Sequence, residues 1–155
     1  MSHKNPHTAS RELQNHLCKI EEWLKNWRIK VNENKSTHIT FTLNKCTCPP
    51  VKLNGVNIPQ QTKVKYLGLH LDRRLTWKNH IEAKRNQIKI TFSKMYWLIG
   101  RKSKLSLHNK VLLYKAIIRP IWTYGIQLWG STSASNREFL QRTQAKILRT
   151  ITNAP

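Results

Sequence analysis

The chain has 155 residues and carries 28 Lys and Arg against 7 Asp and Glu, a formal net charge of +21 at pH 7. This length suits one domain or part of a larger one, and 6 Trp, 4 Tyr and 3 Phe exclude a chain that is disordered throughout. The excess of positive charge predicts a polyanionic partner, with nucleic acid first and an anionic membrane surface second.

The N-terminal half predicts one helix followed by short strands. Residues 1–10 are polar and predict a leader, and a helix is expected from about Thr8 to Trp27 with Ser10 as its N-cap. Alternation of apolar and polar residues predicts a strand over 39–43. The Asn54-Gly55 pair predicts a hairpin over 51–58, and a further strand is expected over 64–71.

The C-terminal half is helical by its apolar spacing. One helix is expected over 77–99, ending at Gly100, and a second over 107–118, capped by Ser106 and ending before Pro120. Residues 121–129 fit either a kinked helix or an extended segment, and a final helix is expected over 137–151. The predicted fold is α+β: a small antiparallel β unit with one preceding helix, followed by a basic helical bundle.

The positive charge is concentrated in the middle third, where residues 51–105 hold 13 basic and 2 acidic residues. Solvated helix faces usually mix both signs, so this imbalance favours contact with a phosphate backbone. The alternative is an ordinary solvated face. The basic residues in question are Lys78, Lys84, Arg85, Lys89, Lys94, Arg101, Lys102 and Lys104.

The acidic residues argue against metal-dependent catalysis within this chain. Asp72 is the only aspartate, and two-metal phosphoryl transfer needs clustered carboxylates. Cys46 and Cys48 lack the spacing and the second ligand pair of a zinc site, even with His38 and Cys18 considered, so no metal ligand is expected.

The cysteine count and the apolar runs bear on the compartment. Three cysteines and no apolar leader indicate a non-secreted protein of the cytoplasm or nucleus. The longest apolar stretch, 116–129, is too short to span a bilayer, so no membrane partner is expected. Most aromatic residues lie on apolar stripes and are expected in the core, with Tyr66 as the exception that could stack on a base.

Three stretches, in this order and spacing, resemble the reverse transcriptases of jockey-type non-LTR retrotransposons. They are Trp23-Leu-Lys-Asn-Trp-Arg-Ile-Lys-Val-Asn-Glu-Asn-Lys-Ser36, Val64-Lys-Tyr-Leu-Gly-Leu-His-Leu-Asp-Arg-Arg-Leu-Thr-Trp77 and Pro120-Ile-Trp-Thr-Tyr-Gly-Ile-Gln-Leu-Trp-Gly130. The resemblance extends from about Asn5 to Pro155.

The resemblance implies that residues 11–72 are the end of a palm domain and residues 73–155 a helical thumb. Tyr66, Leu67 and Gly68 then fall in the primer grip, and Lys35 is a possible accessory palm lysine that assists the departure of pyrophosphate. The implied partner is the duplex of RNA template and DNA primer, with the remaining palm and fingers of the same polyprotein as a second partner.

The departure from the family concerns catalysis. The family's Tyr/Phe-Ala-Asp-Asp turn, which carries its metal-binding aspartates, does not occur in this chain. We therefore expect no catalytic residue, no cofactor and no activity of the chain alone, with Mg²⁺ needed only by a complete enzyme. The alternatives are a co-opted, stand-alone RNA- or DNA-binding protein and an inert, pseudogene-like remnant.

Overall fold

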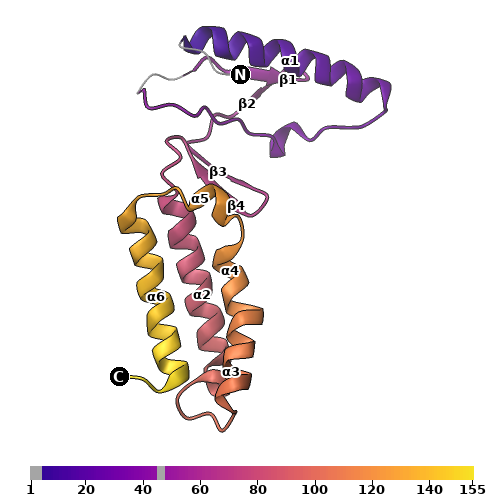
Figure 1. Cartoon of the computed structure of the whole chain (residues 1–155). Coiled ribbons are helices and arrows are strands. Elements are labelled where there is room, and N and C mark those ends of the chain that lie inside the picture. The colour runs from indigo at the N-terminus through magenta and orange to yellow at the C-terminus, as the bar shows by residue number, and fades with distance from the viewer. Residues whose placement is uncertain (1–4, 45–47) are drawn as a thin grey trace. The chain divides into compact units, whose positions relative to one another are not determined.

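The computed structural model describes residues 5–44 and 48–155, and the α+β class is confirmed. Two compact units are present (Figure 1). The N-terminal unit comprises residues 1–65 and 72–75, and the helical unit comprises residues 66–71 and 76–155. The chain passes from one unit to the other within the second β-hairpin.

The regular elements of the N-terminal unit and the two hairpins come first in the chain (Figure 1). They are α1 (Pro6–Asn26), the 3₁₀ turn η1 (Glu33–Lys35), β1 (Val51–Leu53), β2 (Val56–Ile58), β3 (Lys63–Tyr66) and β4 (Leu69–Asp72). The helical unit continues with α2 (Lys78–Ile99), α3 (Leu107–Leu113), the π-helical segment η2 (Tyr114–Ile118), α4 (Arg119–Thr123), α5 (Ile126–Trp129) and α6 (Ala134–Thr152).

Helix α1 begins earlier than its sequence pattern predicted. Asn5, not Ser10, is the N-cap, and its side chain accepts a hydrogen bond from the His7 N–H at 2.9 Å. Pro6 occupies the first turn, where its missing N–H costs nothing, and it keeps Asn5 extended. Ser10 is instead buried, and its hydroxyl donates to the Pro49 carbonyl at 3.2 Å.

The core of the N-terminal unit lies between α1 and the first hairpin. Strands β1 and β2 pair antiparallel, with Lys52 opposite Asn57. Val51, Leu53 and Ile58 are buried from the hairpin side and pack against apolar residues of α1. The Gln14 side chain joins the two elements, because it accepts from the Lys52 N–H at 2.7 Å and donates to the Lys52 carbonyl at 3.0 Å.

The strand predicted over 39–43 does not form. Residues 39–43 make no β-bridge; an isolated bridge joins His38, just before them, to Gln60. The Thr42 N–H donates to the Arg73 carbonyl at 3.0 Å, so its backbone is satisfied by single contacts and not by a ladder. Alternation alone predicted a strand here, but no neighbouring strand completes it.

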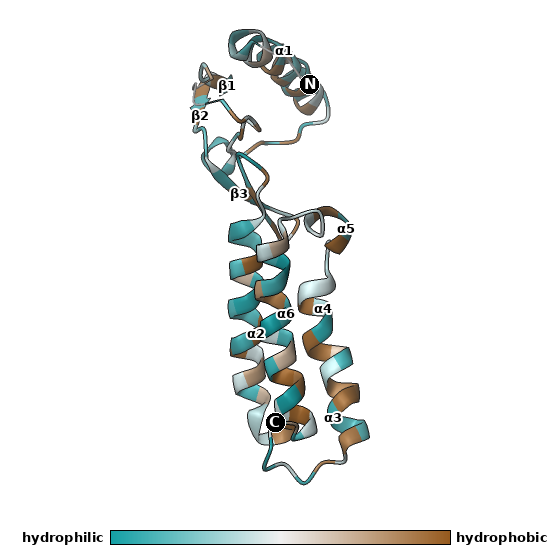
Figure 2. Cartoon of the chain, turned by 60° about the vertical axis from the view of Figure 1, so that its left-hand side comes forward, coloured by the Kyte–Doolittle hydropathy of each residue, from teal (hydrophilic) through white to brown (hydrophobic). Residues whose placement is uncertain are grey.

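The helical unit packs α2 against α6 and against the α3–α4 run. Its core contains eleven buried residues, most of them on α2, η2 and α6: Leu69, Trp77, Ile81, Ile88, Ile99, Tyr114, Ile118, Trp129, Leu140, Ile147 and Ile151. Figure 2 shows hydrophilic residues along much of α2 and hydrophobic residues on α3 and α4. The predicted helix 77–99 is confirmed, and the final helix begins at Ala134, three residues early.

The helix predicted to end before Pro120 continues through it. Residues 107–123 form one helical run, in which η2 has π-helical geometry and the Arg119 N–H donates to the Tyr114 carbonyl. Proline has no N–H to donate, so a carbonyl in the preceding turn loses its partner. A π-turn accommodates this because it changes which carbonyls need a partner. The run then ends at Tyr124, and Gly125, in left-handed geometry (φ 68°), starts the short helix α5.

Candidate nucleic-acid interface

The turn between β3 and β4 presents an apolar tip to solvent. Leu67 and Gly68 have φ angles of 46° and 77°, and the side chains of Tyr66 and Leu67 are 62% and 70% exposed. The Asn54-Gly55 turn of the first hairpin has nearly the same angles, 49° and 77°. Asparagine tolerates this left-handed geometry well, whereas leucine is strained in it, so the Leu67 turn is the one that needs support.

Tyr124 lies against this turn from the helical side. Its hydroxyl donates to the Leu67 carbonyl at 2.7 Å. A Cβ added to Gly68 would lie 3.4 Å from Cε1 of the tyrosine ring, so the ring rests on the glycine. The Tyr124 carbonyl in turn accepts from Nε1 of the buried Trp129 at 3.0 Å, which fixes the tyrosine to the core.

Strand β4 is held at two further points. A Cβ on Gly125 would come within 2.8 Å of Cδ2 of Leu69, so the strand approaches the α4–α5 junction closely. The His70 N–H donates to Nδ1 of His80 at 3.3 Å. His80 is fully buried, and burial, followed by the charges of Lys84 and His70, lowers its pKa to about 4. The imidazole is therefore neutral at pH 7, as accepting through Nδ1 requires.

Two neighbouring basic side chains of α2 lie on different sides of the helix. The Lys84 ammonium sits over the Tyr124 ring, 5.5 Å from its centroid, beside the Leu67 turn. The Arg85 guanidinium stacks on Phe139 of α6 at 3.9 Å, and its Nε donates to the Thr143 hydroxyl at 3.3 Å. Consecutive helical residues point about 100° apart, so the two cannot share one face.

The other predicted basic residues are exposed and run the length of α2. Lys78 and Lys89 lie seven residues before and four after Arg85, on the same side of the helix, whereas Lys94 lies on another. Arg101, Lys102 and Lys104 follow the C-terminus of α2, at the end of the helical unit opposite the Leu67 turn (Figure 1). The structure thus spreads these cations over the helical unit and does not gather them on one helix face.

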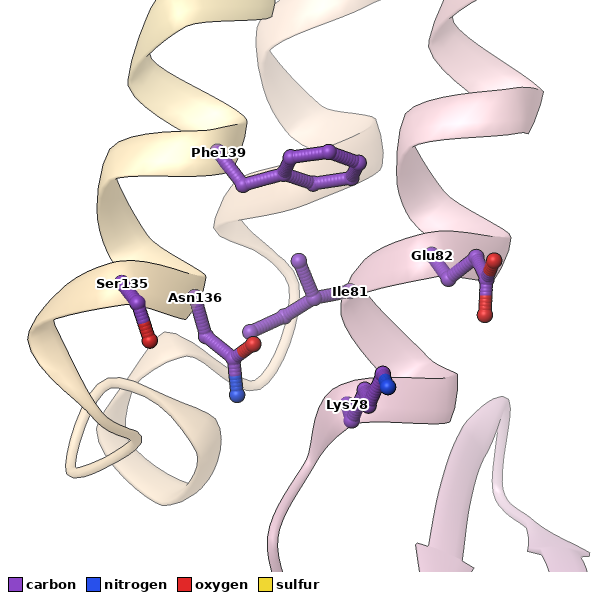
Figure 3. Close-up of a pocket in the computed structure, with 6 residues that line it drawn as sticks. All are labelled: Lys78, Ile81, Glu82, Ser135, Asn136 and Phe139. Carbon is purple, nitrogen blue, oxygen red and sulfur yellow. The ribbon is translucent and has the colours of Figure 1, made fainter.

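An open groove lies beside the start of α2. It has a volume of about 260 Å³ and is lined by side chains of α2 and α6: Lys78, Ile81, Glu82, Ser135, Asn136 and Phe139. Figure 3 shows Phe139 and Ile81 as its apolar part, with Lys78 and Glu82 on one side and Ser135 and Asn136 on the other. Its lining offers one cation, one carboxylate and two neutral polar groups, which does not form a metal or catalytic constellation.

Lys35, which the resemblance singled out, belongs to the N-terminal unit. It ends the η1 turn, is exposed, and its backbone N–H donates to the Asn32 side chain at 3.1 Å. In the same unit, the Asn54 side-chain amide donates to the Glu33 carboxylate at 2.6 Å and lowers the pKa of that carboxyl.

Aromatic residues are more exposed than expected. Trp77 and Trp129 are buried as predicted, and Tyr66, the expected exception, is exposed. Seven further aromatic residues of the described chain are also exposed: Trp23, Trp27, Phe41, Tyr96, Trp97, Tyr124 and Phe139. The expectation of a largely aromatic core was wrong because two small units bury only narrow strips of their helices. Tyr124 and His80 had no local signal, since their roles depend on residues 57 and 10 positions away.

No metal site and no membrane span is found in the described residues. Within 5–44 and 48–155, no three His, Cys, Asp or Glu side chains group as metal ligands. Cys46 of the rejected zinc motif lies outside these residues. In the same ranges, no helix combines the length and apolar character needed to cross a bilayer.

Comparison with known proteins identifies the relatives of this chain. It is 41% identical over 146 residues to the probable RNA-directed DNA polymerase from transposon X-element of Drosophila melanogaster. It is 38% identical over 147 residues to the RNA-directed DNA polymerase from mobile element jockey, and over 149 residues to the probable enzyme from transposon BS, both of the same fly. No family model and no solved structure matches.

These matches cover 94–95% of this chain but only 16% of each relative. The resemblance to jockey-type non-LTR reverse transcriptases is thus confirmed as homology to one segment of those proteins.

Proposed function

We propose that this chain, a homologue of one segment of the jockey-type RNA-directed DNA polymerases, binds the RNA template–DNA primer duplex and lacks the catalytic aspartates. The carrying observation is the charge of the helical unit. Its sequence holds 15 Lys and Arg against 2 acidic residues, Glu82 and Glu138. Glu138 is moreover paired with Arg142 at 2.6 Å, so little negative charge opposes a phosphate backbone.

The dimensions of the helical unit support a duplex as the ligand. Helix α2 has 22 residues and is about 33 Å long, close to one turn of a nucleic-acid duplex. Lys84 and the Leu67 turn lie at its N-terminal end, and Arg101, Lys102 and Lys104 follow its C-terminal end. Cations at the two ends of the helix can contact phosphates that lie about one helical turn apart.

The exposed Tyr66–Leu67 tip is the proposed contact for bases or sugars. Phosphate contacts fix position, whereas apolar and aromatic side chains touch the bases and sugars. Tyr66 and Leu67 supply such a surface. Lys84, whose ammonium lies over the Tyr124 ring, supplies a cation beside it. In a complete polymerase, this tip would seat the primer and Lys35 would assist the departure of pyrophosphate.

Polymerization is proposed to need residues outside this chain. Asp72 is the only aspartate of the sequence, and a two-metal site requires several carboxylates close together. Mg²⁺, primer and template should therefore give no primer extension with the pure chain. Metal-dependent extension that copurifies with the chain through two orthogonal steps would contradict this part of the proposal.

The binding proposal is tested with two variants that remove the same charge. In one, Lys78, Lys89 and Lys94 on α2 are changed to Gln; in the other, the exposed Lys19, Lys25 and Lys30 of the N-terminal unit are changed to Gln. Fluorescence anisotropy with a 20-base-pair RNA–DNA hybrid should show the α2 variant weakened at least about tenfold more than its control. Equal losses would mean that the net charge, and not the helical unit, governs binding.

A further inference from the structure

The Leu67 turn adopts a geometry that its sequence does not favour. Leu67 has a φ of 46°, where the Cβ of a branched apolar side chain crowds its own backbone. In the first hairpin, Asn54 occupies the equivalent position, and Asn-Gly is the pair preferred for such turns. The Leu67-Gly68 turn therefore depends on contacts from outside the hairpin to keep its conformation.

Tyr124 supplies the most direct of these contacts. Its hydroxyl donates to the carbonyl of Leu67 itself, at 2.7 Å, and its ring rests on Gly68. The tyrosine is fixed at its own backbone, since its carbonyl accepts from the buried Trp129 indole at 3.0 Å. A chain of two hydrogen bonds thus runs from the helical core to the exposed turn.

We propose that Tyr124 is a positioning residue for nucleic-acid binding, which acts by holding the Leu67 carbonyl and so fixes the Tyr66–Leu67 tip. This inference rests on the proposed function, since it assigns a role in that same binding. Tyr124 also carries the Lys84 ammonium over its ring at 5.5 Å. One side chain therefore sets the geometry of the apolar tip and of the nearest cation together.

A purely structural role for Tyr124 makes a different prediction. A hydrogen bond from a half-exposed hydroxyl adds little to the stability of a fold. Tyr124→Phe, which removes only the hydroxyl, should therefore leave the melting temperature nearly unchanged while it loosens the tip. If Tyr124 positions the tip, affinity for the duplex falls although the fold stays intact.

The test combines Tyr124→Phe with Leu67→Asn in the full 155-residue chain. We expect Tyr124→Phe to weaken binding of a 20-base-pair RNA–DNA hybrid about fivefold. In the Leu67→Asn background, the turn becomes Asn-Gly and is stable without outside help, so Tyr124→Phe should change affinity less than twofold. Tyr96→Phe, at another exposed tyrosine of the helical unit, is the control and should leave affinity unchanged.

Hydrogen exchange of the free protein gives a second readout that needs no nucleic acid. Tyr124→Phe should speed amide exchange in residues 67–70 and leave that of α2 unchanged. Unchanged affinity and unchanged exchange in Tyr124→Phe, or equal losses of affinity in both Leu67 backgrounds, would overturn the role of Tyr124. If the unmodified chain fails to bind the hybrid, the proposed function fails and this role fails with it; binding that is insensitive to Tyr124→Phe contradicts only the role of Tyr124.

Discussion

Nδ1 of His80 accepts a hydrogen bond from the backbone N–H of His70 at 3.3 Å, and so ties α2 to β4 inside the helical unit. The His80 ring is fully buried and lies about 6 Å from the rings of Trp77 and Trp129, with centroid distances of 6.0 and 6.2 Å. A protonated imidazole could not accept through Nδ1. The contact between the bundle and the second hairpin therefore requires a neutral histidine.

Stability should consequently fall in mild acid. Burial lowers the pKa of His80 to about 4, whereas an unfolded histidine has a pKa near 6.5. Between these values only the unfolded chain binds the proton. The contribution of neutral His80 to the free energy of unfolding is therefore complete above about pH 6.5 and is lost as the pH falls toward 4. The loss is up to about 3 kcal/mol. As the pH is lowered from 7.5 to 4, the melting temperature should drop less in His80→Gln than in the unmodified chain. The control His108→Gln, at an exposed histidine, should behave like the unmodified chain.

Gly125 should tolerate alanine poorly because two costs coincide there. Its φ of 68° strains any L-residue, and an added Cβ would meet Leu69 Cδ2 at 2.8 Å. Gly55 has a φ of 77° but nothing within 4 Å of its Cβ position, so Gly55→Ala isolates the backbone strain. We expect Gly55→Ala to cost about 1 kcal/mol and Gly125→Ala about 2–3 kcal/mol in denaturant titrations. Equal costs would mean that Leu69 is not packed against this junction.

Gln14 should protect one backbone amide of β1. Its side chain bonds both the N–H and the carbonyl of Lys52, on the edge of β1 that faces away from β2. Gln14→Ala should destabilise the N-terminal unit by about 1 kcal/mol and expose the Lys52 amide to exchange. Residue-resolved hydrogen exchange should show Lys52 accelerated in Gln14→Ala and not in Asn15→Ala, an exposed neighbour on the same helix.

Leu67→Asn should make the helical unit more stable and a weaker binder. Asparagine relieves the strain at a φ of 46°, which is worth about 1 kcal/mol, but it removes the apolar tip. We therefore expect a higher melting temperature together with a lower affinity for the RNA–DNA hybrid. Leu112→Asn, which removes another exposed leucine of the helical unit, is the control for affinity. A gain in stability without any loss of affinity would mean that Leu67 does not contact the ligand.

Local patterns in the sequence predicted the parts of the fold that depend on local chemistry. The apolar spacing of α2 and the Asn54-Gly55 turn each encode one element within a few residues, and both form. The alternation at 39–43 was misleading because a strand needs a partner, which local pattern cannot supply. Pro120 was misjudged because the π-turn that accommodates it begins six residues earlier, at Tyr114.

The candidate site also has features that depend on local sequence and features that depend on the tertiary fold. The basic composition could be read from the sequence because charge is a local property. The single strand expected over 64–71 was wrong, since the structure breaks it into β3 and β4 at the Leu67–Gly68 turn. The partners that hold the turn could not be read from the sequence, since Tyr124 and His80 reach it only through the tertiary fold. The helical repeat likewise directs the adjacent cations Lys84 and Arg85 to different neighbours, Tyr124 and Phe139.

The salt dependence of binding tests the central claim most directly. Contact with about five phosphates predicts that the association constant for the RNA–DNA hybrid falls at least about 100-fold between 50 and 200 mM salt. In a plot of log association constant against log salt concentration, the variant with Lys78, Lys89 and Lys94 changed to Gln should show a slope smaller by up to about 2, because Lys94 lies on a different side of α2 from the other two. The slope of the N-terminal control should be unchanged. An affinity that changes less than about threefold over this range would contradict the assignment of this chain as a duplex-binding segment.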